Sequence, residues 1–232
     1  MLAASKQPVM RNKILAGLPH EELIRLRPYL ERVHLKKHET VYLIGDDVQC
    51  AYLVESGLLS LTSTTESGAT IEVAMVGSEG GVGLPVISRE GMIPFEVTVQ
   101  FTTEALKIGV KQLQEEFDKG DALHEFVLHY LSVLIAQISQ STICNRFHSL
   151  EERLSRWLLI VQDRVNKDNL NLTQESISNA LGVPRTAITM AIGKFQRDGI
   201  IRNSRGKIHI LDRTKLEISS CECYRIMRDA LL

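Results

Sequence analysis

Residues 172–211 constrain the fold more than any other part of the sequence. Thr173 can cap the start of a helix, and Gly182 stands where that helix would end in a residue with positive φ. Pro184 suits the first turn of a second helix, because that turn has no partner for a backbone N–H. This spacing predicts a helix-turn-helix, a motif typical of DNA-binding proteins.

The second helix is expected to run from Arg185 to Asp198, with its apolar side chains on one face and polar side chains on the others. Short apolar runs then flank a turn at 204–206, which predicts a two-stranded wing. The segment from Thr173 to Leu211 holds six Lys or Arg and two acidic residues, whereas the whole chain has a formal charge of −1. Such a local excess of positive charge is typical of a surface that contacts DNA phosphates.

A helix of this kind inserts its N-terminal end into the major groove of DNA, where Arg185 is placed to donate two hydrogen bonds to a guanine edge. Thr186 and Thr189 are the predicted helpers at a base or phosphate. The other predicted DNA contacts position the backbone and are Thr173, Gln174, Lys194, Arg202, Arg205 and Lys207. An ordinary helical hairpin whose charges are merely solvated is the alternative at this point.

Residues 126–145 contain no Asp, Glu, Lys or Arg. Scattered Ser, Gln, Thr, Asn and His side chains argue against a membrane span, which needs about 20 predominantly apolar residues. A long helix that is buried on several faces fits better. Its predicted dimer seam is Leu123, Val127, Tyr130 and Leu134, and its second apolar face is Leu128, Leu131 and Ile135. The central core helix of a monomer is the alternative, although recognition of palindromic DNA favours two-fold symmetry.

The N-terminal half contains short apolar runs separated by glycine and acidic turns. Strands are expected at 40–44, 51–54, 58–62, 71–76, 97–101 and 105–108. Strands of this length and spacing predict an antiparallel sandwich or barrel. Helices are expected at 11–15, 21–29 and 150–166.

At 232 residues with 44% hydrophobic side chains, the chain is long enough for two domains. The N-terminal residues lack the apolar core of a signal peptide, so we expect a cytoplasmic protein. The cysteines Cys50, Cys144, Cys221 and Cys223 are scattered and are expected to be free, reduced thiols. A redox or metal role for Cys221 and Cys223 is the alternative.

The order of these parts resembles the Crp/Fnr family of bacterial regulators over nearly the whole chain. Gly45, Asp46, Tyr52, Val54 and Gly57 resemble the family's roll signature, and Gly77, Glu79, Gly80, Gly83, Leu84 and Pro85 resemble the segment that lines its ligand pocket. The resemblance implies an α+β fold with a β-roll sensor (residues 1–120), a dimerisation helix (121–148) and a winged helix-turn-helix (149–232). Arg185 matches the arginine that the family uses on guanine. The implied partners are double-stranded DNA, a second copy of the chain and RNA polymerase.

Departures from the family pattern bear on the effector. Cyclic-nucleotide members carry an arginine and a serine or threonine where this chain has residues 94–97, and the carboxylate of Glu96 would repel a phosphate there. We therefore expect no tight binding of cyclic AMP. The candidate pocket for an unidentified effector is Gly77, Glu79, Gly83, Leu84, Phe95 and Glu96. Glu79 could equally be a satisfied turn carboxylate.

Other sensing chemistries have little support in the sequence. An iron–sulfur sensor of the Fnr type needs a close cysteine group near the N-terminus, and no cysteine precedes Cys50.

Thr186 and Met190 stand where the cyclic-AMP member has charged residues that contact bases, and the resemblance therefore implies a different target sequence.

The sequence predicts a dimeric, sequence-specific transcription regulator that is not an enzyme and needs no metal, cofactor or membrane. One alternative is a ligand-sensing interaction protein without specific DNA binding. Another is an enzyme on a cupin-like barrel, which would need a histidine and carboxylate cluster on neighbouring strands.

Overall fold

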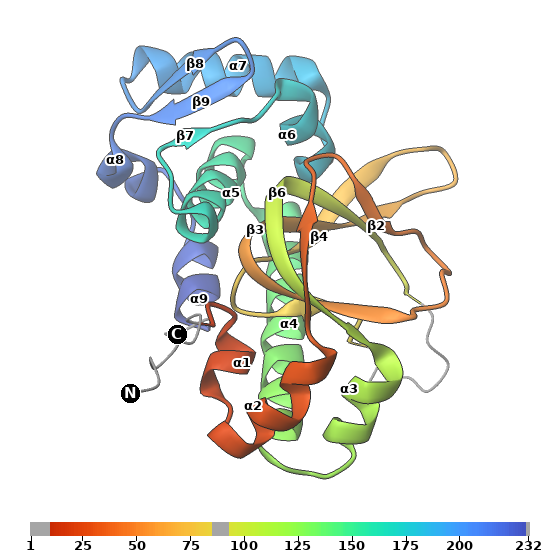
Figure 1. Ribbon diagram of the computed structural model, residues 1–232. Helices are drawn as coiled ribbons and strands as arrows, with labels where there is room; N and C mark the ends of the chain where they lie inside the picture. The colour runs from red at the N-terminus through yellow and green to blue at the C-terminus, as the bar shows by residue number, and fades with distance from the viewer. Residues whose placement is uncertain (1–9, 85–92, 231–232) are drawn as a thin grey trace.

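The computed structural model describes residues 10–84 and 93–230 (Figure 1). Short helices open the N-terminal half, and an antiparallel sheet follows them. The helices are α1 (Lys13–Gly17), α2 (His20–Leu26) and the 3-10 turn η1 (Arg27–Tyr29). The strands are β1 (Glu31–Leu35), β2 (Thr40–Tyr42), β3 (Cys50–Thr64), β4 (Thr70–Val76), β5 (Gly81–Val82) and β6 (Glu96–Gly109), and α3 (Val110–Phe117) comes next.

The sheet has the strand order β1-β6-β3-β4, with β2 paired to β6 and β5 paired to β3. Strands β3 and β6 each replace two of the short strands that the sequence predicts. Register shifts between Val54 and Leu59 let β3 bend without ending. Gly57 makes this possible because its φ is +95° and a Cβ there would lie 2.4 Å from the Thr102 carbonyl oxygen.

Helix α4 (Ala122–Phe147) runs beside the roll and links the two halves of the chain (Figure 1). The phenol of Tyr130 donates to the Gly81 carbonyl at 3.0 Å. The side-chain amide of Gln137 donates to the Met75 carbonyl at 3.2 Å and accepts from the Met75 N–H at 3.3 Å. These contacts hold the buried face of α4 against β4 and β5.

The predicted dimer seam is wrong at three of its four residues. Leu123, Val127 and Tyr130 are buried within this chain, and Leu134 packs against the same core. The sheet needs an apolar cover, and these side chains supply it. Leu123, Val127 and Tyr130 are therefore not available to a second copy of the chain, whereas Leu134 is only partly buried.

By length and composition alone, α4 is apolar enough to cross a membrane, and 22% of its most apolar window is buried in the protein. The polar side chains of Gln137 and Ser141 are among its buried residues. Gln137 uses its amide to hold α4 to the sheet, which is a structural role within a folded domain.

The C-terminal half begins at Ser149, which caps α5 (Leu150–Val165) through a reciprocal pair of hydrogen bonds with Glu152. The elements that follow are β7 (Asn169–Leu170), α6 (Gln174–Leu181), α7 (Arg185–Arg197), β8 (Ile201–Ser204), β9 (Lys207–Ile210), α8 (Arg213–Ile218) and α9 (Cys223–Asp229). Strand β9 lies between β7 and β8. The predicted helix-turn-helix and wing are therefore present, whereas the sequence did not predict β7, α8 or α9.

The two halves share a packed boundary. Leu58 and Met75 from the sheet belong to the same core as Trp157 of α5. The indole N–H of Trp157 also donates to Glu72 of β4 at 2.7 Å. The β3–β4 hairpin therefore packs directly on the C-terminal half.

Candidate nucleic-acid interface

The turn between α6 and α7 is fixed by local hydrogen bonds. Thr173 Oγ1 accepts from the Ser176 N–H at 3.0 Å, and Ser176 Oγ accepts from the Thr173 N–H at 3.1 Å. Helix α6 ends at Gly182, which has a φ of 62°. The Val183 N–H then donates to the Ser178 carbonyl at 3.2 Å. These bonds set the direction in which α7 leaves the turn.

Helix α7 has one buried face and one exposed face. Its buried side chains are Ile188, Ala191, Ile192 and Phe195. Arg185 and Thr186 are exposed at its first turn, and Met190 is 70% exposed further along. In Figure 1, α7 lies at the outer end of the molecule, away from α3. The N-terminal end of α7 is therefore open to a large partner.

Three more of the predicted DNA contacts, Gln174, Thr189 and Lys194, have partners inside the protein. Thr189 Oγ1 donates toward Gln174 Oε1 at 2.8 Å and also lies 3.0 Å from the Arg185 carbonyl oxygen. The first of these contacts joins α6 to α7. Lys194 Nζ lies 3.7 Å from Glu151 in α5. This exposed ion pair leaves the Lys194 ammonium at the surface.

The wing ends in a tight turn that carries positive charge. Arg205 and Gly206 have φ values of 45° and 78°, the combination typical of a type I′ hairpin turn. Arg202 and Lys207 flank the turn, and both are exposed. The wing thus presents three cations on the same C-terminal half as α7.

Sequence reasoning missed Arg153 of α5, whose guanidinium donates to the Leu181 carbonyl at the end of α6. Burial lowers the pKa of Arg153. No local spacing connects residues in separate helices, so only the packing identifies this support for the turn.

Glu79, one of the candidate effector residues, has partners inside the protein. Glu79 accepts from the Gly77 N–H at 3.0 Å and pairs with Arg164 of α5, with 2.8 Å between Oε1 and Nε. Both charged side chains are almost fully buried. Glu79 is thus a satisfied carboxylate that joins the roll to α5.

The remaining candidates lie elsewhere on the roll. Leu84 is buried in the core, and Phe95 is half-buried against it. Gly83 has a φ of 69°, and a Cβ there would lie 2.6 Å from the Cys50 carbonyl oxygen. Glu96 opens β6 opposite Thr62 of β3. Pro85, the last residue of the family's pocket segment, lies outside the described residues.

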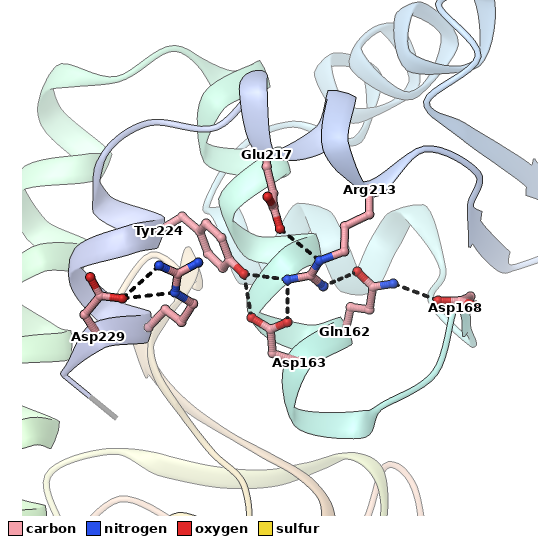
Figure 2. Close-up of polar contacts among 8 residues, drawn as sticks. Gln162, Asp163, Asp168, Arg213, Glu217, Tyr224 and Asp229 are labelled. Atoms are coloured by element: carbon pink, nitrogen blue, oxygen red, sulfur yellow. Dashed lines mark hydrogen bonds and ion pairs between the residues drawn. The ribbon is translucent and has the colours of Figure 1, made fainter. Parts of the chain in front are cut away.

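A cavity of about 300 Å³ lies between the roll, α4, α5 and α9. Glu79, Gln137 and Arg164 are among its lining residues. Beside it, a polar network holds α8 and α9 to α5 (Figure 2). Asp163 pairs with Arg213 at 2.8 Å and accepts from the Tyr224 phenol at 2.8 Å. Burial and this bond to Asp163 raise the pKa of Tyr224 to about 12.

Two groups of side chains have metal-ligand character in the described part of the chain. The acidic group of Glu22, Glu116 and Asp121 is already satisfied: Arg25 lies 2.6 Å from Glu116 and 3.0 Å from Asp121, and Glu22 accepts from backbone N–H groups at the start of α4. The second group is Cys144, His148, Cys221 and Cys223. The sequence did not predict that these four side chains meet.

A roll, a long helix and a winged helix-turn-helix together define a regulator that binds DNA. Residues 152–218 match the family model of the Crp-like helix-turn-helix domain, and residues 32–119 match that of the cyclic nucleotide-binding domain. The chain belongs to the Crp/Fnr family and is a DNA-binding transcription regulator. The family and the fold that the sequence predicted are confirmed.

Named relatives agree with this assignment. The global nitrogen regulator of Nostoc sp. is 24% identical over 185 residues, which is 75% of this chain and 82% of that protein. The transcriptional activator protein anr of Pseudomonas aeruginosa is 24% identical over 189 residues, covering 78% of this chain and 77% of that protein.

Solved structures show the same fold. FixK2 from Bradyrhizobium japonicum superposes with a TM-score of 0.72 at 14% identity, covering 83% of this chain and 98% of that one. The global regulator CLP from Xanthomonas campestris superposes with a TM-score of 0.69 at 16% identity, covering 83% of this chain and 99% of that one.

Proposed function

We propose that the chain works as a homodimer that binds an imperfect palindrome, with one α7 in each of two major grooves about one helical turn apart. The observation that carries this proposal is the open N-terminal end of α7, where Arg185 is exposed while the opposite face of the helix is buried. In this proposal Arg185 contacts a guanine edge, and Thr186 and Thr189 assist. The surrounding polar and cationic residues contact phosphates and are Thr173, Gln174, Lys194, Arg202, Arg205 and Lys207.

The proposed dimer contact is the exposed stripe of α4. Leu128, Ile135 and Thr142 are exposed and recur at intervals of seven, with Ser132 and Ser139 between them. In the proposed dimer, the α4 helices of two copies would pack against each other along these side chains. The two-fold symmetry would then place one α7 helix on each subunit. The proposed domain boundaries are 1–120 for the sensor, 121–148 for the dimerisation helix and 149–232 for the DNA-binding domain.

A small effector other than cyclic AMP is proposed to act on the sensor. Two observations argue against cyclic AMP: the carboxylate of Glu96 at the start of β6, and the ion pair that engages Glu79 with Arg164. A DNA-binding regulator of this kind would work in the cytoplasm, contact RNA polymerase, catalyse no reaction and need no membrane.

The experiment that tests this function selects random DNA with the purified full-length protein, at two salt concentrations and with or without cyclic AMP. We expect an enriched palindrome that does not depend on cyclic AMP. Arg185→Ala should lose about 1–3 kcal/mol of binding free energy on that palindrome and little on random DNA. Arg205→Ala, at the wing turn, is the matched control and should weaken binding to both sequences alike.

Different outcomes contradict different parts of the proposal. Equal losses on both sequences for Arg185→Ala would make Arg185 a phosphate contact. Enrichment only with cyclic AMP would show that the sensor binds this nucleotide after all. Binding whose affinity does not fall with salt would favour the interaction protein that lacks specific DNA binding.

A further inference from the structure

Three of the four cysteines and one histidine meet where the end of α4 lies beside the start of α9. Cys144 is in the last turn of α4, and His148 is the residue that ends this helix. Cys221 lies between α8 and α9, and Cys223 is the first residue of α9. One ligand atom from each of these residues lies within 4.8 Å of all the others.

The distances match a single tetrahedral ion. Cys144 Sγ and Cys221 Sγ are 3.6 Å apart, and Cys223 Sγ lies 3.4 Å from His148 Nδ1. A tetrahedral zinc ion, with Zn–S bonds of about 2.3 Å and Zn–N bonds of about 2.0–2.1 Å, separates its ligand atoms by roughly 3.5–3.8 Å. An iron–sulfur cluster requires a wider arrangement, because each thiolate then binds a different iron.

The residues around the four ligands have the character of an outer coordination shell. His148 Nε2 lies 3.4 Å from Glu222 Oε1, so the carboxylate can hold the ring with Nδ1 turned toward Cys223. A carboxylate on the far nitrogen is the usual partner of a metal-binding histidine. Gln140 Nε2 donates to Cys223 Sγ at 3.0 Å and so helps to orient this side chain.

Burial and charge at the cluster also suit a closed structural site. Cys144, Cys221 and Cys223 are all buried. The positive charge of Arg156 in α5 acts on Cys144. Three thiolates around a divalent ion carry one net negative charge, which the guanidinium of Arg156 offsets in part.

We propose that Cys144, His148, Cys221 and Cys223 bind one zinc ion in a closed, tetrahedral, structural site. The thiols lose their protons when the ion binds. The ion links the end of α4 to the start of α9, and α9 packs on both α4 and α5. It therefore fixes how the C-terminal helix is held against the junction of the dimerisation helix and the DNA-binding domain.

The first test measures the metal content of the full-length protein, purified without a histidine tag and under reducing conditions. We expect about one zinc per chain in the wild type and in Cys50→Ser, whose thiol lies outside the cluster. Cys223→Ser and His148→Ala should lose most of the zinc. Cobalt added to the metal-free wild type should give the visible absorption of tetrahedral thiolate coordination. Cys50→Ser should give the same spectrum, and Cys223→Ser should not.

A second measurement remains decisive if a variant folds poorly, because it uses the wild type alone. Removal of zinc with a chelator should lower the unfolding temperature, and added zinc should restore it, since a ligand that binds only the folded state stabilises that state. Three results would overturn the proposal: no stoichiometric zinc together with no binding of added zinc or cobalt, several irons per chain, or a disulfide between Cys144 and Cys221 in the freshly prepared protein.

Discussion

Glu72 is the buried carboxylate at which the two halves of the chain meet. It accepts hydrogen bonds from the Ser60 hydroxyl and from the indole of Trp157. Burial raises the pKa of Glu72 to about 7, and the two hydrogen bonds oppose that effect only in part. The ionised form of this side chain is therefore costly in the folded protein.

This carboxylate makes stability depend on pH. In the unfolded chain Glu72 loses its proton near 4.5, whereas in the folded chain it keeps the proton up to about 7. Between these values the folded state binds more protons, so the free energy of unfolding falls as the pH rises from about 4.5 to about 7. Glu72→Gln should remove this contribution, because its side chain can still accept from Trp157 but has no charge.

Thermal unfolding between pH 5 and pH 8, followed by the fluorescence of the single tryptophan, measures this effect. Glu66→Gln, in the exposed turn between β3 and β4, is the control and should keep the slope of the wild type. An unchanged slope in Glu72→Gln would assign the pH dependence to another group.

The roles of single residues in their own turns could be predicted from the sequence. Contacts between residues far apart in the sequence could not. Thr173 and Gly182 act on their own backbone neighbours, so their residue types alone were informative. Glu79 meets Arg164 across the domain boundary, and no short-range pattern links these two residues. The contact of Arg153 with the α6–α7 turn could not be predicted for the same reason.

At the scale of the element, α4 has two apolar faces with different roles. The face that includes Leu123 and Val127 covers the sheet, whereas Ile135 is 64% exposed on the other side. Hydrophobic periodicity showed both stripes but could not show which one the sheet would bury. The four-three-four spacing of the first stripe is typical of a coiled coil and predicted a dimer seam, whereas in the structure that stripe covers the sheet.

The exposed stripe predicts where the dimer can be broken. Ile135→Asp should place a charge in the proposed helix pair and shift the protein toward monomer, because an unpaired charge in an apolar contact is costly. Ile24→Asp is the matched control, since Ile24 is similarly exposed but lies on α2. Sedimentation at several concentrations measures both variants, and a dimer that tolerates Ile135→Asp would move the contact to another surface.

The positions of the strands could be predicted from the apolar runs, but the continuity of β3 and β6 could not. The sequence divided β3 and β6 into four short strands because apolar runs stop near Gly57 and again near Thr102–Thr103. In the structure both strands continue through a bulge, where Thr103 Oγ1 accepts from the Leu58 N–H at 3.1 Å. A side chain from the partner strand thus replaces a backbone bond that the bulge interrupts.

At the scale of the whole molecule, charge is concentrated rather than spread. The formal charge is −1 overall, yet the segment of α6, α7 and the wing is strongly basic. Phosphate contacts release bound counterions, so the affinity for DNA should fall steeply as salt rises. Lys207→Ala should reduce the slope of log affinity against log salt by about 1 per subunit.

Lys111→Ala is the control for this measurement, because Lys111 is exposed on α3, far from α7 (Figure 1). Its salt slope should equal that of the wild type. An unchanged slope for Lys207→Ala would mean that the wing does not contact the phosphates.

The cysteine cluster illustrates what only the tertiary fold reveals. Cys221 and Cys223 are close in the sequence, but Cys144 lies 77 residues before Cys221, and no local spacing connects it to them. Packing of α9 on α4 brings them together. By contrast, the domain order and the family could be predicted because each domain has its own local pattern.

The turn of the helix-turn-helix lies directly beside the sensor. A Cβ at Gly182 would be 3.0 Å from the Ile71 side chain, so a β4 residue of the sensor occupies the space next to this turn. The DNA-binding half is consequently not a transferable module. A chimera that joins it to another regulator's sensor needs a side chain of similar shape at the position of Ile71, and over evolutionary time substitutions at these two positions should occur together.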